Sequence, residues 1–411
     1  MPSAGSTLRQ RGLLPLLTAE VISTVGTQLT AVALPWFVLI STGSPAQAGF
    51  VAAAETAPVL VFGVISGGWV DRVGARRWML ISDTCRAPLI ALIPVLSGLG
   101  MLPFWLLLVL VFVIGSFVVP YGASQQMMLA ETIGDDVASL AQATSILQSA
   151  TRLTMLIGPP LAGLLIAVLG PRQVLLIDAA SYLVVVAIIL ARVPRPSRPA
   201  TSDRPRGVLD GVRVLGRDRL LANWTAATIL GEMAYQALFL SIPILVYARY
   251  QESSTVVGLL IGAFGAGALL GSLVATAVAG RFSAIRLSVI GKVAQALMFF
   301  GMLPVLPPEA VGVVLFVLGA FNGLTNGPSF AVRLARIPAP LRAKALTAMT
   351  AGTMLGATVG LACFGPAFEA FRFSSVFAML AGLQVASATL YVIGARQADR
   401  PQAVIGEPVA G

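Results

Sequence analysis

Few side chains in this sequence could carry out acid–base chemistry inside its apolar segments. Glu20, Glu55 and Glu232 each stand alone in a long apolar run. An ionisable group inside a lipid bilayer costs about 2.5–3.5 kcal/mol on insertion scales, so it needs a partner or a cavity. Burial disfavours the charged form of a carboxyl group, which allows such groups to bind and release protons near neutral pH. Because the chain has no His, these three carboxyl groups are the candidates for proton transfer.

Further charged residues could form a network in the same segments. Asp83 and Arg86 are three residues apart and are predicted to pair across one helical turn. Arg152 could pair with Glu131 or Asp83, or bind an anionic group of a substrate. Asp178 is expected to hydrogen-bond locally. For the glutamates, a structural hydrogen bond to a neighbouring helix is the alternative to proton transfer, and for Asp83 and Arg86 a structural or latch role is expected.

Other kinds of chemistry lack their usual residues. Cys85 and Cys363 fall in apolar segments, and neither a disulfide framework nor a metal site is indicated. The sequence has no Gly-x-x-x-x-Gly-Lys-Ser/Thr loop for ATP and no Ser-centred nucleophile motif. We therefore predict a protein that is not an enzyme, binds no cofactor and uses a proton gradient as its energy source.

The elements that carry these residues are long and apolar. Of 411 residues, 57% are hydrophobic and 11% are charged, against about 25% charged in soluble domains. An apolar run of about 18 or more residues can cross the hydrocarbon core of a membrane as a helix. Twelve such runs predict an all-α membrane protein with twelve transmembrane helices: 13–40, 46–70, 78–97, 102–128, 140–169, 173–191, 220–247, 255–279, 285–304, 310–331, 344–369 and 373–394.

The basic residues indicate the orientation of the chain. The net charge is +10, and most of the 27 Lys and Arg fall in segments that would share one side of the membrane with the N-terminus. This bias predicts cytoplasmic termini in a bacterial inner membrane. The apolar run that follows Arg9 and Arg11 is too long for a secretion signal and is expected to be the first helix. Nucleic acid is not an expected partner, because the largest basic cluster is one connecting loop.

The twelve runs divide into two sets of six. Residues 192–219 contain eight Arg and four Pro, which predicts a cytoplasmic linker with a short surface helix around 207–218. We expect an N-terminal six-helix bundle over 1–191, a C-terminal bundle over 220–395 and a flexible tail over 396–411. The two halves show a weak internal repeat. A shift of 209 residues aligns their basic loops with each other and places Lys292 on Asp83. Lys292 is expected to be structural.

The connection after the second run carries a signature. Gly67-Gly68-Trp69-Val70-Asp71-Arg72-Val73-Gly74-Ala75-Arg76-Arg77 resembles the G-x-x-x-D-R-x-G-x-R-R loop of the major facilitator superfamily. Gly74 permits a positive φ, and Asp71 can accept charge-assisted hydrogen bonds. The resemblance implies two six-helix pseudo-repeats that rock around a central substrate site. It also implies that the cytoplasmic side is closed by a loop containing Gly67, Asp71, Arg72, Gly74, Arg76 and Arg77.

Other segments resemble one branch of that superfamily, the macrolide-efflux and enterobactin-exporter type. They are Ala33-Leu34-Pro35-Trp36, Asp83-x-x-Arg86-Ala87, Gly158-Pro159-Pro160-Leu161-Ala162-Gly163 and Ile177-Asp178-Ala179-Ala180-Ser181-Tyr182. The run with Gly158, Pro159 and Gly163 is similar to a motif of antiporters, which implies export. The loop between the eighth and ninth runs departs from the family pattern, because it lacks the Asp and the Gly.

The resemblance also implies where the halves meet and where a substrate lies. Helices 2, 5, 8 and 11 would form the seam, and closely spaced glycines occur there: Gly63, Gly67, Gly258, Gly262, Gly267, Gly271, Gly352, Gly356 and Gly360. Glu20 and Glu232 would lie beside the central cavity, and Glu55 nearer the outer end of its helix. The candidate cavity residues are Gln28, Trp36, Phe37, Met233, Tyr235, Gln236, Phe239, Phe264, Phe321, Asn322 and Asn326.

Together these features predict a monomeric secondary active transporter in the lipid bilayer that exports a drug-like or secondary-metabolite small molecule in exchange for protons. One alternative is a siderophore or metabolite exporter, or an importer, of the same fold. Another is a membrane sensor or assembly partner that does not transport. In that case Glu20 and Glu232 would be dispensable and residues 192–219 critical.

Overall fold

The computed structural model describes residues 13–62, 70, 72–133, 137–193, 208–250, 253–304, 306–338 and 341–397, and their regular structure is helical apart from one isolated bridge between Ala279 and Phe282. The first half contains α2 (Leu13–Thr42), α3 (Pro45–Phe62), α5 (Ala75–Gly98), α6 (Phe104–Ser116), α7 (Val118–Ile133), α8 (Val137–Leu169) and α9 (Pro171–Arg192). After α10 (Val208–Arg217), the second half contains α11 (Arg219–Arg249), α12 (Ser254–Ala277), α13 (Ala284–Phe300), α14 (Pro308–Arg336), α15 (Arg342–Ala370) and α16 (Phe373–Arg396).

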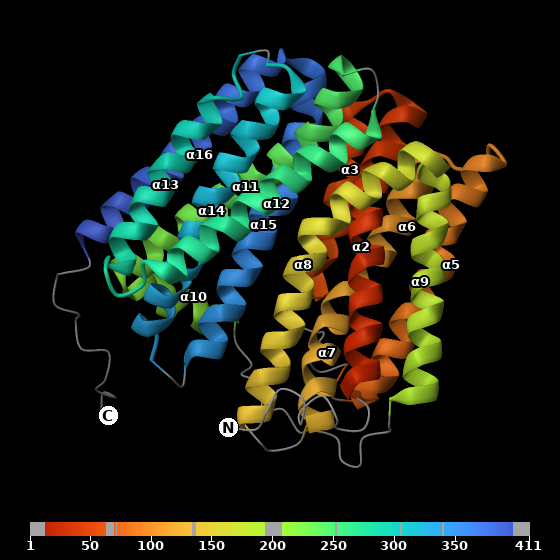
Figure 1. Ribbon diagram of the computed structural model, residues 1–411, viewed down its shortest axis with the longest axis horizontal. Helices are drawn as coiled ribbons and strands as arrows, with labels where there is room; N and C mark the ends of the chain where they lie inside the picture. The colour runs from red at the N-terminus through yellow and green to blue at the C-terminus, as the bar shows by residue number, and fades with distance from the viewer. Residues whose placement is uncertain are drawn as a thin grey trace.

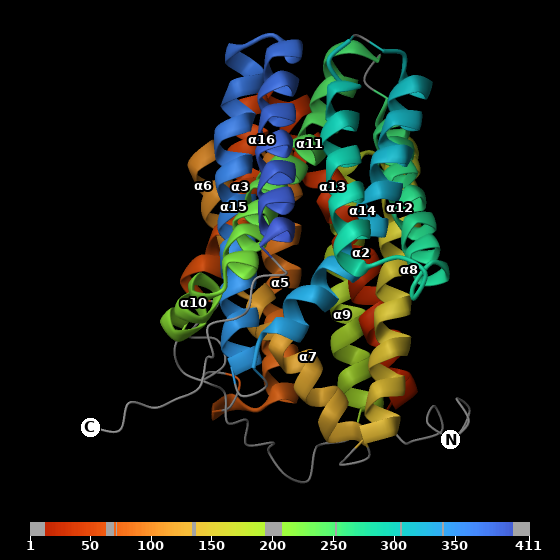
Figure 2. The ribbon, with the colours of Figure 1, turned by 90° about the vertical axis from the view of Figure 1, so that its left-hand side faces the viewer.

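The helices form two bundles, α2 to α9 and α11 to α16 (Figure 1). The short helix α10 lies at one end of the molecule, which we call the linker end; the opposite end, where α2 turns into α3, is the far end (Figures 1 and 2). The charge bias of the sequence predicts that the linker end is cytoplasmic.

The hydrophobic core shows where the bundles join. Toward the far end, one core cluster runs through both bundles and includes Phe37, Val51, Leu238, Val257 and Phe364. Toward the linker end the core divides into a cluster in the first bundle around Leu13, Met79 and Met128, and another in the second around Trp224, Ile337 and Met349. The bundles therefore share a core at the far end and separate at the linker end, as Figure 1 also shows.

Ten of the described helical segments are long and apolar enough to cross a membrane, judged by length and composition alone, and α6 and α7 count together as one of them. The two remaining bundle helices are α3, whose described part ends at Phe62, and α13, which has 17 residues. The predicted all-α membrane fold is confirmed, whereas the number of twelve spans stays a prediction.

Two local features refine the predicted elements. The run at 102–128 is broken at Phe117 into α6 and α7, three residues before Pro120. Proline has no N–H to donate and its ring crowds the carbonyl four residues earlier, which accounts for the break. The predicted linker helix is present as α10, where Gly211 allows close packing on Lys344 of α15.

A candidate substrate cavity between the two bundles

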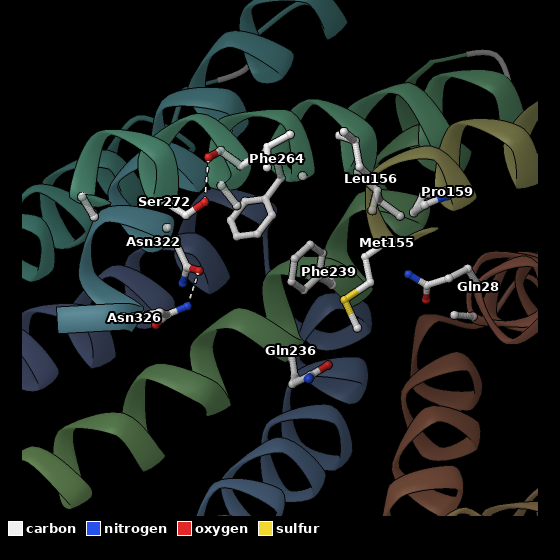
Figure 3. A pocket seen from close by; sticks show the side chains of 18 of the residues that line it. Gln28, Met155, Leu156, Pro159, Gln236, Phe239, Phe264, Ser272, Asn322 and Asn326 are labelled. Carbon is white, nitrogen blue, oxygen red and sulfur yellow. Dashed lines mark hydrogen bonds between the residues drawn. The ribbon is translucent and has the colours of Figure 1, made fainter. Parts of the chain in front are cut away.

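A cavity of about 1080 Å³ lies between the bundles, with walls from α2, α3 and α8 of the first and from α11 to α15 of the second. Two prolines shape one wall. Pro159 and Pro160 of α8 have no N–H, so the carbonyls of Met155 and Leu156 lack their usual helical partners. The side chains of Met155, Leu156 and Pro159 line the cavity at this point (Figure 3).

Aromatic and amide side chains occupy the middle of the cavity. Phe239 of α11 and Phe264 of α12 meet edge to face, with ring centroids 5.0 Å apart. Figure 3 shows Gln28 on one side of this pair and Asn322 and Asn326 on the other. Nδ2 of Asn326 donates a hydrogen bond to Oδ1 of Asn322 at 2.8 Å. A large apolar space with a few amide groups suits a lipophilic molecule that carries some hydrogen-bonding groups.

Glu55 of α3 is the one ionisable side chain among the described residues that line the cavity. It is half-buried, and Arg86 and Asp178 in the same bundle act on it electrostatically. The sequence predicts that Glu55 lies nearer the outer end of its helix, where a role in an extracellular gate is expected. The structure adds that Glu55 lines the central cavity, and the gate role stays a prediction.

Some predicted cavity residues lie elsewhere. Gln28, Gln236, Phe239, Phe264, Asn322 and Asn326 line the cavity, whereas Trp36, Phe37, Met233, Tyr235 and Phe321 do not. Trp36 is 3% exposed and packs edge-on against Tyr247. Tyr235 is turned into its own bundle, where its hydroxyl donates to Oε1 of Gln295 at 3.0 Å. Residue type alone did not reveal which face of each helix meets the cavity.

Glu20 lies outside the cavity lining, in the interior of the first bundle. It is 2% exposed, and its carboxylate accepts hydrogen bonds from the hydroxyl of Tyr121 at 3.3 Å and from Nε2 of Gln125 at 2.5 Å. Both partners are on α7, so Glu20 connects α2 to α7. This geometry matches the structural alternative, and a role in proton transfer stays a prediction.

Asp83 and Arg86 do not form the predicted hydrogen-bonded pair. Both are buried, and within the described part of the chain neither carboxylate oxygen of Asp83 nor Nε of Arg86 has a hydrogen-bond partner. The guanidinium of Arg86 lies over the ring of Tyr182, 4.4 Å from its centroid. Asp178, which was expected to bond locally, also accepts a hydrogen bond from Thr30 of α2 at 2.5 Å. The interior of the first bundle thus gathers acidic groups around Arg86.

The second bundle contains a related arrangement. Oε1 of Glu232 accepts from Nε2 of Gln236 at 2.8 Å, so Glu232 is one side chain removed from the cavity. The Lys292 ammonium is buried and lies 5.7 Å from the ring centroid of Tyr391. A basic group therefore lies over a tyrosine between α13 and α16, as it does between α5 and α9. The shift of 209 residues relates Tyr391 to Tyr182, whereas it aligns Lys292 with Asp83 and not with Arg86, so only the tyrosines of the two arrangements follow the weak repeat.

The structure describes only part of the signature loop, because Gly67 and Asp71 lie outside the described residues. The contact by which this loop is predicted to close the cytoplasmic side therefore stays a prediction. Gly74 has the expected positive φ of 89°, and Arg72 and Arg77 are exposed. Arg76 is buried, and its guanidinium donates to the carbonyls of Ile189 at 2.8 Å and Val193 at 3.3 Å. Arg76 thereby satisfies carbonyls at the end of α9, within its own bundle.

The remaining two members of the predicted charge network are Arg152 and Glu131. Arg152 belongs to α8, but its side chain is outside the described residues. Glu131 is half-buried near the end of α7. Their pairing stays a prediction.

The seam between the bundles is formed by α3 with α15 and by α8 with α12. Gly163 of α8 and Gly258 of α12 face each other so closely that a Cβ on either would lie 3.0 Å from the Cα of the other. The Ser254 hydroxyl also donates to the carbonyl of Gly163 at 3.1 Å. Gly158 belongs to the same antiporter-like run as Gly163, but it packs on Gln28 of α2 within its own bundle. The run therefore serves both the seam and the wall of the cavity.

Several seam glycines predicted from spacing belong elsewhere. Gly262 packs on Pro160 across the seam, but Gly267 and Gly271 pack on α14. The glycines of α15 face α11: Gly352, Gly356 and Gly360. These five allow close packing inside the second bundle and not at the seam, a distinction that spacing alone cannot make. Gly63 lies outside the described residues.

Comparisons with known proteins agree with this architecture. The family model described as Major Facilitator Superfamily matches residues 16–361. A multidrug efflux pump named Tap from Mycolicibacterium fortuitum is 29% identical over 90% of this chain and 92% of its own. The Tap of Mycobacterium tuberculosis is 26% identical, with 96% of each chain covered.

Solved structures share the fold. The nucleoside transporter NupG superposes with a TM-score of 0.73 at 13% identity, covering 93% of this chain and 98% of that one. A bacterial homolog of the human lysosomal transporter Spinster, in an inward-facing and unoccupied conformation, superposes with a TM-score of 0.70 at 15% identity, covering 96% of each chain. At these identities the likeness concerns the fold alone.

Proposed function

The chain belongs to the major facilitator superfamily, and we propose that this multi-pass transporter of the bacterial inner membrane exports lipophilic, drug-like molecules in exchange for protons. The observation that carries the proposal is the cavity of about 1080 Å³ between the bundles, with its aromatic pair, its amides and one carboxyl group. The two Tap proteins, which are multidrug efflux pumps, support the same direction of transport.

The cavity lining suggests how a substrate is held. Phe239 and Phe264 offer apolar faces that accept many molecular shapes, whereas the amides of Gln28, Asn322 and Asn326 offer hydrogen bonds without charge. Glu55 adds one negative charge and favours substrates that carry a positive group. This combination suits a transporter of lipophilic cations.

Proton coupling is proposed at carboxyl groups in contact with the transport path. Buried acidic groups serve as proton relays in pumps and transporters. A proton on Glu55 would remove the charge that holds a cationic substrate, so that proton and substrate would exclude each other. Glu232 is one hydrogen bond from the cavity through Gln236 and is the principal proton carrier for neutral and cationic substrates alike, and Glu20 is a further candidate in the first bundle. The transporter would act as a monomer, without a cofactor.

A whole-cell experiment tests the proposal. Cells that lack their own efflux pumps express this chain, and the accumulation of ethidium, a lipophilic cation, is followed by fluorescence. We expect accumulation to fall at least several-fold on expression and to return to the control level when an uncoupler collapses the proton gradient. An increase in ethidium accumulation on expression would indicate an importer. Accumulation that stays low after the uncoupler is added would contradict proton coupling.

A further inference from the structure

At the far end of the seam, Glu369 in the last turn of α15 reaches across to the first bundle. Its Oε2 accepts hydrogen bonds from the Ser44 hydroxyl at 2.7 Å and from the backbone N–H of Ala46 at 3.1 Å. Ser44 directly precedes α3, and its Oγ in turn accepts from the backbone N–H of Gln47 at 3.2 Å. Ser44 is thus the N-cap of α3, and Glu369 adds a carboxylate from the other bundle to the same helix end.

The beginning of a helix is a favourable place for this carboxylate. The first N–H groups of a helix have no partner inside it, and the aligned peptide dipoles leave a partial positive charge there. Pro45 has no N–H, Gln47 donates to Ser44, and Ala46 donates to Glu369. Glu369 therefore satisfies a backbone donor that α3 cannot satisfy by itself, and its negative charge complements the dipole.

The same contact line continues along α3 and α15. Gly49 and Gly365 lie so close that a Cβ on Gly49 would be 2.6 Å from the Cα of Gly365. Farther from the far end, the hydroxyls of Thr56 and Thr358 are 2.9 Å apart. Opening the far end requires α3 to leave α15, which breaks all three contacts. Of these, the Glu369 contact is the one that involves a charged side chain.

From this geometry we infer that Glu369 is the gating residue of the far end. Its carboxylate, held on the first turn of α3, stabilises the conformation in which the bundles are closed at the far end. When the contact breaks, the cavity can open there. The inference goes beyond the proposed function, because it depends on neither the substrate nor the coupling ion.

State-dependent labelling tests the inference on the full chain in its membrane. Cys85 and Cys363 are replaced by Ala, and the reporter Ala52→Cys is introduced on the cavity wall between the Gly49 and Thr56 contacts. A membrane-impermeant maleimide is applied from outside in intact cells and from inside in inverted vesicles. Glu369→Gln is expected to raise the labelling rate from the far end roughly two- to fivefold, the range for loss of a charge at a helix N-terminus, and to lower the rate from the linker end.

Two controls make the result specific. Glu309→Gln changes an exposed glutamate in the first turn of α14, within its own bundle, and should leave both rates unchanged. Glu369→Asp keeps the carboxylate and should restore part of the parent behaviour. Unchanged rates in Glu369→Gln, or an equal rise from both ends, would overturn the inference. Because labelling needs neither substrate nor proton gradient, its result is independent of whether the proposed efflux is correct.

Discussion

Among single residues, Glu55 gains a contact that its place in the sequence does not predict. It is expected nearer the outer end of its helix, and the structure shows that it also lines the central cavity. An ion pair in a site of low dielectric constant is worth more than the same pair in water. A cationic substrate should therefore depend on Glu55 strongly, whereas a neutral one should rely on the aromatic rings and amides around it.

The variant Glu55→Gln tests this dependence. It should lower the rate of efflux of a lipophilic cation by about ten- to a hundredfold, since hydrogen bonds to charged groups contribute about 1.5–3 kcal/mol. Efflux of a neutral lipophilic dye of similar size should change by less than about threefold. Both rates are measured in the same cells after the dyes are preloaded. Equal losses for the two dyes would show that Glu55 does not select charge.

Arg86 illustrates a second residue-scale effect. It is buried beside Asp83 and above Tyr182, so its removal leaves acidic groups in the bundle interior without the positive charge. Arg86→Met should therefore lower the free energy of unfolding by about 3–5 kcal/mol, measured by thermal unfolding of the purified protein in detergent. Arg286→Met, at an exposed arginine, is the matched control and should change it by less than about 0.5 kcal/mol. Equal effects of the two substitutions would contradict the structural role of Arg86.

At the scale of helices, the seam depends on backbone contact between glycines. Gly163 and Gly258 bring α8 and α12 together beside the cavity, and Gly49 and Gly365 do the same for α3 and α15. A backbone neighbour cannot move aside as a flexible side chain can. Larger residues at these positions should therefore keep the helices apart at the far end without disturbing either bundle.

Gly163→Val tests this role of the seam. Its Cβ would lie 2.6 Å from the carbonyl oxygen of Ser254, so the far end should fail to close and transport should fall about tenfold or more. Gly382→Val is the matched control, since a Cβ there has no neighbour within 4 Å among the described residues. Efflux rates are compared at equal amounts of protein in the membrane. Normal efflux by Gly163→Val would show that close contact at this seam is not needed.

The helices were easier to predict than the site. A membrane-spanning helix must match the thickness of the bilayer, so its length follows from the run of apolar residues; α11 occupies Arg219–Arg249 where 220–247 was predicted. The cavity depends on how two bundles rotate against each other. Gln28 and Trp36 lie on the same helix, and packing of the neighbouring bundle decides that Gln28 lines the cavity and Trp36 does not. No local pattern in the sequence contains that information.

At the scale of the whole molecule, the shared core at the far end and the divided core at the linker end describe a transporter that is open on one side. Movement between the two open states must exchange the contacts at the far end for contacts at the linker end. The signature loop that contains Asp71 is expected to supply linker-end contacts, and Glu369 is proposed as the charged contact among those at the far end. Substrate and proton would enter the same cavity from opposite sides of the membrane.

Transport by the purified protein in liposomes tests whether export is coupled to protons. Ethidium transport is measured with an imposed pH gradient and without one, for the parent chain and for Glu232→Gln. We predict transport that is driven by the gradient in the parent chain and lost in Glu232→Gln, with normal purification and folding of the variant. Equal transport with and without the gradient in the parent chain would contradict proton coupling, and unchanged gradient-driven transport in Glu232→Gln would contradict the role of Glu232.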